Sequence, residues 1–468
     1  MFAAAVACGA SRAQAQKTAG ASRKSAPGDR VRVACIGFHG QGRGHIRAYL
    51  DMDDVEIACL CDVDSNLFAD AVKGVEEKGR RPPRCVQDLR RVFDDKSIHA
   101  VSIATPNHWH SLAAIWAMQA GKDVYVEKPV SHNVFEGRQV VRTARKYKRI
   151  CQSGTQCRSM KGTIDAIRYV HAGKIGEVRI ARGICFRDRK SIGIAGGEQP
   201  VPAGVDYDIW LGPAPKKPVL RKRFHYDWHW FWDYGNGDLG NQGIHQMDIA
   251  RWGLKKAGLP RTVWSLGGRF GYKDDGETPN TELTFCDYGD CQLIFETRGL
   301  PTPDYRGAKV GVVFHGTDGY VVLTRYEGGA AFDLDGKKVR DFNGGGNHHR
   351  NFIDAVRNRK ATTLTGDIEE GHVSSALCHV GNISYRLGEE VPFREGGKAF
   401  GDDKDACEVF ERMQEHLKSN QVPLDGATYR LGRKLTIDPA KEVFRGDAEA
   451  NALLTRNYRS PYIVPASI

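Results

Sequence analysis

The stretch that most constrains this chain is an apolar segment that runs directly into a glycine-rich turn. Residues 31–36 read VRVACI, a pattern typical of a buried strand, and are followed by Gly37, Phe38, His39, Gly40, Gln41 and Gly42. Glycines in such a turn let the backbone approach a pyrophosphate, whose charge faces the N-terminus of the next helix. In the GxGxxG spacing Gly37 and Gly42 fit, whereas His39 occupies the middle position. Residues 37–42 are therefore predicted to hold a dinucleotide, with His39 as a departure from the usual turn.

A second apolar segment, 55–61, ends at Asp62. An acid at the end of the second strand accepts hydrogen bonds from the adenosine ribose hydroxyls and repels a 2′-phosphate. Asp62 therefore favours NAD over NADP, with a helix cap as its alternative role. Arg80, Arg81 and Arg84 follow it, which leaves NADP open as the less favoured cofactor.

A third strand, 100–104, leads into the turn Thr105, Pro106, Asn107 and His108. A helix over 111–120 then carries the chain to a strand that ends at Glu127, Lys128 and Pro129. In an open α/β sheet the carboxyl ends of the strands face the ligand crevice, so Lys128 is expected to point at a bound ligand. His108 and His110 do not indicate a metal site, because no acid or cysteine with matching spacing accompanies them.

Taken in this order, the glycine turn, the Thr-Pro-Asn turn and Glu-Lys-Pro resemble the N-terminal half of the Gfo/Idh/MocA oxidoreductases, the family of glucose-fructose oxidoreductase and inositol dehydrogenase. The resemblance implies that the cofactor is also held by Thr105, Pro106, Asn107, His108, Glu127 and Lys128. The run Gly154-Thr155-Gln156-Cys157-Arg158 is similar to the family's step into its second domain, and Arg158 is a candidate substrate ligand.

Past residue 176 the hydrophobic period changes to two, first over 178–186 and then at 263–270, 281–286, 291–297, 309–315 and 320–324. The predicted fold class is therefore α/β. A Rossmann domain with a doubly wound parallel sheet spans 29–152, and an α/β domain with an open, mainly antiparallel sheet spans 153–390. Residues 391–468 are a C-terminal extension, expected to be irregular apart from a helix over 406–418.

Residues 187–232 interrupt the second domain with little periodicity and a cluster of aromatic side chains over 224–232. A long insertion of this kind is usually functional or disordered, and this one is too aromatic to be disordered. Trp228 and Trp230 are candidates for stacking on a sugar. A satellite core or a subunit contact is the alternative.

The insertion is followed by Asn241, His245 and Asp248, which resemble the family's second signature of an acid, a histidine four positions later and an acid three after that. The resemblance implies that His245 is the catalytic base and that Asp248 contacts the substrate. Asn241 replaces the first acid with an uncharged partner, and a lower pKa for His245 is expected if their side chains touch.

The net charge and the N-terminal residues limit the possible partners and the possible location of the protein. The net charge of +11 is scattered and comes without a nucleic-acid motif, and no apolar run is long enough to span a membrane. Residues 1–28 are alanine-rich, with an Ala13-Gln14-Ala15 step of the kind that signal peptidase cleaves, so a periplasmic or exported protein is expected. A basic start is missing, which leaves a cytoplasmic protein with a disordered extension as the alternative.

The resemblance implies an NAD-dependent oxidoreductase, without a metal, that moves hydride between nicotinamide and a secondary alcohol or ketone of a sugar or polyol. His245 would take the hydroxyl proton, and Lys128 would stabilise alkoxide character. A homo-oligomer is expected. Two alternatives stay open: an NAD-dependent glycosidase that oxidises C3 transiently and eliminates the glycoside, and a non-enzymatic protein that keeps its cofactor locked in place.

Overall fold

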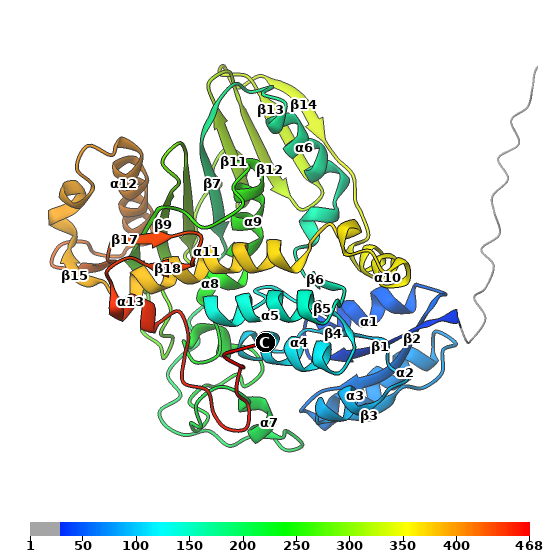
Figure 1. Ribbon diagram of the computed structural model, residues 1–468. Helices are drawn as coiled ribbons and strands as arrows, with labels where there is room; N and C mark the ends of the chain where they lie inside the picture. Colours follow the sequence, from blue (N-terminus) through cyan, green and yellow to red (C-terminus); the bar gives the residue numbers. More distant parts are fainter. Residues whose placement is uncertain (1–28) are drawn as a thin grey trace, which may run out of the picture.

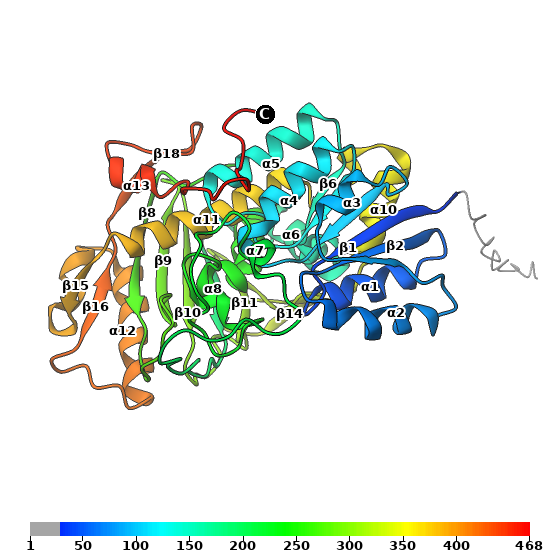
Figure 2. The same cartoon turned by 90° about the horizontal axis from the view of Figure 1, so that it is seen from below.

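The computed structural model describes residues 29–468, so the expected leader over 1–28 lies outside the described residues. Two sheets lie side by side, a parallel one in the N-terminal half and a larger one in the C-terminal half (Figures 1 and 2). This arrangement confirms the predicted fold class. None of the helices in the described part is long and apolar enough to cross a membrane.

The N-terminal sheet has six parallel strands in the order β3-β2-β1-β4-β5-β6, the doubly wound arrangement. Its strands are β1 (Val31–Ile36), β2 (Val55–Cys61), β3 (Arg84–Val86), β4 (Ala100–Ile103), β5 (Asp123–Val126) and β6 (Cys151–Ser153). Its helices are α1 (Gly42–Leu50), α2 (Phe68–Glu76), α3 (Arg90–Asp94), α4 (Asn107–Gln119) and α5 (Val134–Lys146). Helix α4 begins at Asn107 rather than at the expected Ser111, because Pro106 takes the N-cap position, where a missing N–H costs nothing.

The second sheet is antiparallel apart from the pairing of β7 with β10. Its main path runs β14-β13-β12-β11-β7-β10-β9-β8-β16-β15. The strands are β7 (Val178–Phe186), β8 (Thr262–Gly268), β9 (Thr281–Asp287), β10 (Gln292–Arg298), β11 (Val310–Gly316), β12 (Tyr320–Arg325), β13 (Gly328–Phe332), β14 (Lys338–Phe342), β15 (Glu389–Pro392), β16 (Thr428–Leu431), β17 (Leu435–Asp438) and β18 (Val443–Phe444).

The second half also contains a set of helices. They are α6 (Lys161–His171), α7 (Tyr207–Leu211), α8 (Gly237–Asn241), α9 (Gly243–Gly253), α10 (His348–Asn358), α11 (Ile368–Arg386), α12 (Lys404–Ser419) and α13 (Ala448–Ala452). Helix α11 contacts α5 of the parallel half as well as α9 and β8 of the second half, and Figure 1 shows it running between the two. It therefore fixes the position of one half against the other.

The C-terminal extension is more regular than expected. Besides the predicted helix, which is α12, it contains β16, β17 and β18, which extend the second sheet from β8. These strands have four residues or fewer, too few for an alternating pattern to show in the sequence. Its last residues pack on the parallel half, where Tyr462 and Val464 join the core.

The insertion over 187–232 folds into a small core of its own beside the parallel sheet. Its buried residues are Trp210, Leu211, Ala214, Val219, Phe224 and Trp228, together with Tyr234. The insertion is fastened to the end of β2, where the Ser65 amide donates to the Gly204 carbonyl at 3.1 Å and the Asp206 amide donates to Val63 at 2.9 Å. The insertion thus forms a wall over the carboxyl edge of the parallel sheet.

Candidate active site

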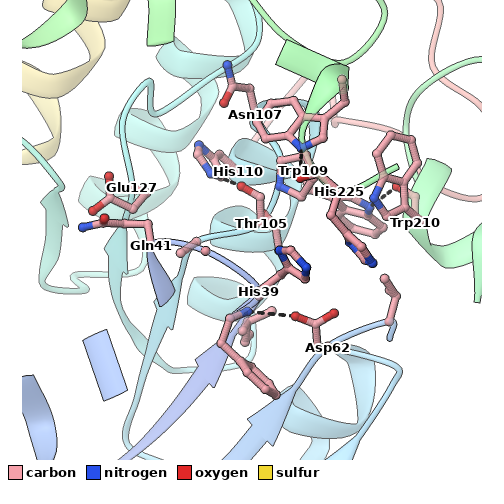
Figure 3. A pocket seen from close by; sticks show the side chains of 18 of the residues that line it. His39, Gln41, Asp62, Thr105, Asn107, Trp109, His110, Glu127, Trp210 and His225 are labelled. Atoms are coloured by element: carbon pink, nitrogen blue, oxygen red, sulfur yellow. Dashed lines mark hydrogen bonds between the residues drawn. The ribbon is translucent and has the colours of Figure 1, made fainter. Parts of the chain in front are cut away.

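A cavity of about 330 Å³ lies between the carboxyl edge of the parallel sheet and the insertion (Figure 3). The sheet side contributes residues 36–41, 61–63, 104–107, Glu127 and Lys128. The insertion side contributes Ile209, Trp210, His225, Tyr226, Trp228 and His229. We call these two sides the Rossmann wall and the insertion wall.

The glycine turn is shaped for a close backbone approach. Gly37 has φ +78°, and a side chain on it would lie 2.8 Å from the Thr105 amide. A side chain on Gly42, the first residue of α1, would overlap the Gly37 carbonyl oxygen. Gly37 and Gly42 are thus needed to bring the turn against β4 and α1, a geometry that fits a pyrophosphate at the helix N-terminus.

The departure at His39 has a structural consequence. Its side chain is exposed at the turn, and its ring stacks on His225 of the insertion wall, with centroids 4.1 Å apart and planes at 12°. His225 in turn lies 3.0 Å from the Asp64 carboxylate through Nε2. His39 therefore links the turn to the insertion at the place where the usual pattern has a glycine.

Asp62 lies at the end of β2 and faces the turn. Its carboxylate accepts hydrogen bonds from the Phe38 amide at 2.8 Å and from the Asp64 amide at 3.0 Å. Burial raises the pKa of Asp62 to about 6, although these hydrogen bonds oppose the rise. The helix-cap role belongs to Asp64, which accepts from the Asn66 amide. Asp62 keeps acceptor capacity at the cavity, which fits a ribose diol.

Two of the three arginines that follow Asp62, Arg80 and Arg84, are engaged elsewhere. Arg80 donates to the carbonyls of Leu50 and Met52, and Arg84 pairs with Asp95 at 3.2 Å. Neither residue is part of the cavity wall.

The Thr-Pro-Asn turn forms the far end of the Rossmann wall. Thr105, Pro106 and Asn107 line the cavity, and the Asn107 side chain donates to Asn236 Oδ1 at 3.0 Å. His108 is buried and does not line the cavity, and its Nε2 lies 2.9 Å from the Trp210 carbonyl. Burial lowers the pKa of His108 to about 3. His108 thus fastens α4 to the insertion.

Glu127 and Lys128 enter the cavity from the end of β5. Burial raises the pKa of Glu127, but the hydrogen bond from His45 at 3.1 Å and nearby cations outweigh it and hold this pKa at about 2. Lys128 is half-buried and donates from Nζ to the Asn241 carbonyl at 2.9 Å. Burial lowers the pKa of Lys128, while the Glu127 carboxylate opposes this shift. The buried Glu127 carboxylate thus lies next to Lys128, whose side chain lines the cavity.

Of the second-signature residues and Arg158, one reaches the cavity. Asn241 lines it, whereas His245, Asp248 and Arg158 do not. Arg158 and Asp248 form a buried ion pair at 2.8 Å. His245 packs against Tyr326, with ring centroids 4.9 Å apart, and its Nδ1 has no partner among the described residues.

Of the two candidate tryptophans, the structure places one in the cavity. Trp228 is part of the insertion wall, whereas Trp230 is buried outside it beneath the Arg189 guanidinium, 5.3 Å from the ring centroid.

His229 is a functional candidate that sequence reasoning missed. It lies in the insertion wall and stacks on Trp228, with ring centroids 3.7 Å apart. Its Nδ1 is 2.5 Å from the Tyr226 carbonyl, which only accepts, so Nδ1 carries the proton and Nε2 keeps a lone pair. Burial lowers the pKa of His229 to about 3, so the ring is neutral at pH 7. The only sequence signal was its place inside the aromatic cluster.

Comparison with known families matches both halves of the chain. Residues 31–155 match the NAD-binding Rossmann-fold domain of the Gfo/Idh/MocA oxidoreductase family, and residues 193–419 match the C-terminal alpha/beta domain of the same family.

Glycosyl hydrolase family 109 proteins are among the curated relatives. The one from Shewanella pealeana is 30% identical over 154 residues, 32% of this chain and 34% of the relative. The one from Saccharopolyspora erythraea is 28% identical over 166 residues, 35% of this chain and 36% of the relative. The matched region thus spans about a third of these relatives.

Solved structures share the fold. Levoglucosan dehydrogenase in complex with NADH and L-sorbose has a TM-score of 0.56 at 20% identity, covering 75% of this chain and 95% of that one. The WlbA dehydrogenase of Bordetella pertussis, in complex with NADH and UDP-GlcNAcA, has a TM-score of 0.55 at 18% identity, covering 74% and 94%. With both domain matches and this shared architecture, the chain belongs to the Gfo/Idh/MocA family of oxidoreductases, and its residues 31–155 are an NAD-binding Rossmann domain.

Proposed function

We propose that this protein is an NAD-dependent oxidoreductase that transfers hydride between nicotinamide and a secondary carbinol or carbonyl carbon of a sugar or polyol. The observation that carries the proposal is one cavity whose walls hold a strand-end acid, a cation at the Glu-Lys-Pro corner and a neutral imidazole. Asp62 would bind the ribose diol, and the Gly37 turn would hold the pyrophosphate.

Bound NAD supplies a hydride acceptor or donor at C4 of its nicotinamide ring. In the oxidation direction Lys128 Nζ, held above Asn241, would donate a hydrogen bond to the reacting oxygen and stabilise its alkoxide character. A neutral imidazole would take the hydroxyl proton. We assign this role to His229, because this residue lines the cavity and its Nε2 carries no proton, whereas His245 lies outside the cavity wall.

The aromatic insertion wall supports a sugar-like substrate. Trp228 and Trp210 bring apolar ring surface into a cavity that also contains polar side chains, and aromatic rings stack on the C–H faces of sugars. The dehydrogenases that share this fold were solved with L-sorbose and with UDP-GlcNAcA.

A second candidate function is an NAD-dependent glycosidase, which the curated relatives named glycosyl hydrolase family 109 proteins support. Here C3 oxidation would acidify the neighbouring C–H, elimination would expel the glycoside, and water addition and reduction would complete the cycle without net change in the cofactor. The same His229 and Lys128 would serve the redox steps.

One assay separates the two candidates. The purified protein is incubated with NAD and a panel of free sugars and polyols, and separately with aryl glycosides of the same sugars. Net NADH formation with a free sugar supports the dehydrogenase. Aryl alcohol release without NADH accumulation supports the glycosidase. If neither product forms across the panel, the proposal of a sugar oxidoreductase is wrong.

We also propose that the protein is a homo-oligomer and is exported. The exposed strand β14 at the sheet edge, with Val339 57% exposed, supports an association surface. Light scattering that finds only monomer would exclude the oligomer.

Intact-mass analysis of the native protein tests export. A chain that begins at Gln16 supports export, and a cytoplasmic chain with Met1 intact excludes it.

A further inference from the structure

A chain of hydrogen bonds runs through the core of the parallel half to the corner that carries Lys128. It begins at Tyr49, whose hydroxyl donates to Ser102 Oγ at 3.2 Å. Ser102 Oγ lies 2.9 Å from His45 Nδ1, and His45 Nε2 lies 3.1 Å from the Glu127 carboxylate. All four side chains are at most 3% exposed. The proposed hydride transfer needs Lys128 but has so far used none of these four side chains.

The partners in this chain fix which ring nitrogen of His45 carries the hydrogen. An ionised carboxylate only accepts hydrogen bonds, so Nε2 must carry a hydrogen toward Glu127. Because Ser102 accepts from Tyr49, its own hydroxyl hydrogen is free to be donated to Nδ1. Each bond thus has one hydrogen, and the His45 ring is held with its donor facing the carboxylate.

Other groups hold the Glu127 carboxylate in the same place. Gln156 donates from Nε2 to Glu127 Oε1 at 2.9 Å, and the Lys128 amide donates to Oε2 at 3.1 Å. A side chain on Gly154 would lie 2.8 Å from the carboxyl carbon, so the glycine leaves the room that the carboxylate needs. Glu127 therefore fastens the backbone at the residue whose side chain enters the cavity.

The charge of Glu127 also acts on the Lys128 ammonium. Burial raises the pKa of Glu127, and the hydrogen bond from His45 is the first of the effects that oppose this rise. Burial lowers the pKa of Lys128, and the Glu127 carboxylate is the first group that opposes this fall. The other charged groups that act on Lys128 are Arg187, Arg189 and Asp238, and the histidines near it, whose pKa values are lowered by burial, are His110, His229 and His245.

We infer that His45 is a positioning residue for the proposed reaction, because through Glu127 it fixes the backbone of Lys128 and keeps the Lys128 ammonium charged. This role rests on the proposed function, in which Lys128 donates to the reacting oxygen. His45 acts from the core, since it is buried and is not part of the cavity wall.

The test measures the protonation of Lys128 without turnover. The full chain without added NAD is treated with trace acetic anhydride, which reacts with the neutral amine, and peptide mass spectrometry gives the labelling rate of Lys128. His45→Leu removes the donor to Glu127. The variant should raise this rate at pH 8 about five- to tenfold, because neutralising the carboxylate lowers the pKa of Lys128 by about one unit.

Two further variants separate the two ends of the imidazole ring. His45→Gln can still donate to Glu127 and should stay within twofold of the parent rate. His45→Asn is too short to reach Glu127 but keeps a polar partner for Ser102, so it should behave as His45→Leu and replaces that variant if it does not fold. A Lys128 rate that stays within twofold of the parent in His45→Leu and His45→Asn, or that rises equally in His45→Gln, would overturn the inference.

Lys122 is the internal control for a general loosening of the fold. It directly precedes β5, is 2% exposed and donates from Nζ to the Ile98 carbonyl at 3.0 Å. Its labelling rate should be the same in every variant. A parallel rise for Lys122 and Lys128 would make His45 a purely structural residue and refute the inference.

Turnover gives a second readout. Because a charged lysine is needed to donate to the reacting oxygen, kcat of His45→Leu relative to the parent should fall further as the pH rises from 6 to 9, whereas His45→Gln should follow the parent profile. Absence of turnover in every protein, the parent included, would refute the proposed function and leave the labelling result intact.

Discussion

The Rossmann wall and the insertion wall face each other across one cavity, but they are built in different ways. The Rossmann wall comes from strand ends and the turns after them, so its residues occur in short contiguous motifs such as 37–41 and 105–107. The insertion wall comes from a segment with little regular structure that packs on a core of its own. Backbone rules therefore fix the Rossmann wall, where we propose that the cofactor binds, whereas the insertion wall, where we propose that the substrate binds, depends on how one insertion folds.

The largest effect is expected at the catalytic base, which we propose comes from the insertion wall. We expect His229→Ala to lower kcat by about 10²- to 10⁴-fold, the range for loss of a general base. Its neutral ring keeps Nε2 free at pH 7, and because burial holds the pKa of His229 at about 3, kcat/KM for oxidation should show no acid limb between pH 5 and pH 8.

His245→Ala is the matched control, because burial also lowers the pKa of His245 to about 3 while the ring lies outside the cavity wall. A larger loss of kcat in His245→Ala than in His229→Ala would return the base to the helix of the second signature and contradict the insertion wall as its source.

Lys128 tests the Rossmann wall at its catalytic end. Lys128→Ala should lower kcat by about 10²-fold, because the hydrogen bond from Nζ to the reacting oxygen strengthens as charge develops there. NAD affinity, measured by fluorescence titration, should change little. The exposed Lys73→Ala is the control and should behave as the parent. Turnover of Lys128→Ala at the parent rate would make Lys128 a structural residue.

The two walls also differ in how well the sequence predicts them. Strand ends and glycine positions are visible as patterns in the sequence, because hydrophobic period and turn chemistry follow directly from residue type. The fold class predicted in this way is confirmed. The roles predicted for Gly37, Asp62 and Lys128 stay predictions, although the structure places all three residues in the cavity wall. His229 was missed because no periodicity places the insertion over the cavity. Arg158 and Asp248 were expected at the substrate, but their mutual burial became apparent only from packing between η3 (Gln156–Ser159) and α9.

Asp62 lies in the Rossmann wall, and a smaller effect is expected for its substitution. NAD should bind more tightly than NADP. Asp62→Ala should reduce the ratio of their dissociation constants about tenfold, because it removes the hydrogen bonds to the ribose and the repulsion of a 2′-phosphate. Asp62→Asn removes the charge but retains an acceptor for the Phe38 amide. This variant therefore separates the effect of the charge from the effect of losing the hydrogen bond to the glycine turn. Tighter binding of NADP than of NAD to the parent protein would exclude the proposed role of Asp62.

The smallest effect is expected at Asn241, where the two walls and the second signature meet. If its side chain tuned His245, Asn241→Asp would raise the pKa of His245 by roughly one unit. The structure shows no hydrogen bond between these side chains within the described residues; Asn241 instead lines the cavity and holds Lys128 through its carbonyl oxygen. Because the pKa of His245 is already about 3, a rise of that size would still leave the ring neutral above pH 5.

We therefore expect Asn241→Asp to change KM by about two- to fivefold, because it places a new charge beside Lys128. The pH profile of kcat/KM between pH 5 and pH 8 should stay superimposable on that of the parent protein. Asn241→Leu controls for the loss of the amide. An acid limb that enters this range only in Asn241→Asp would show that position 241 does tune His245, and would count in favour of His245 as the base.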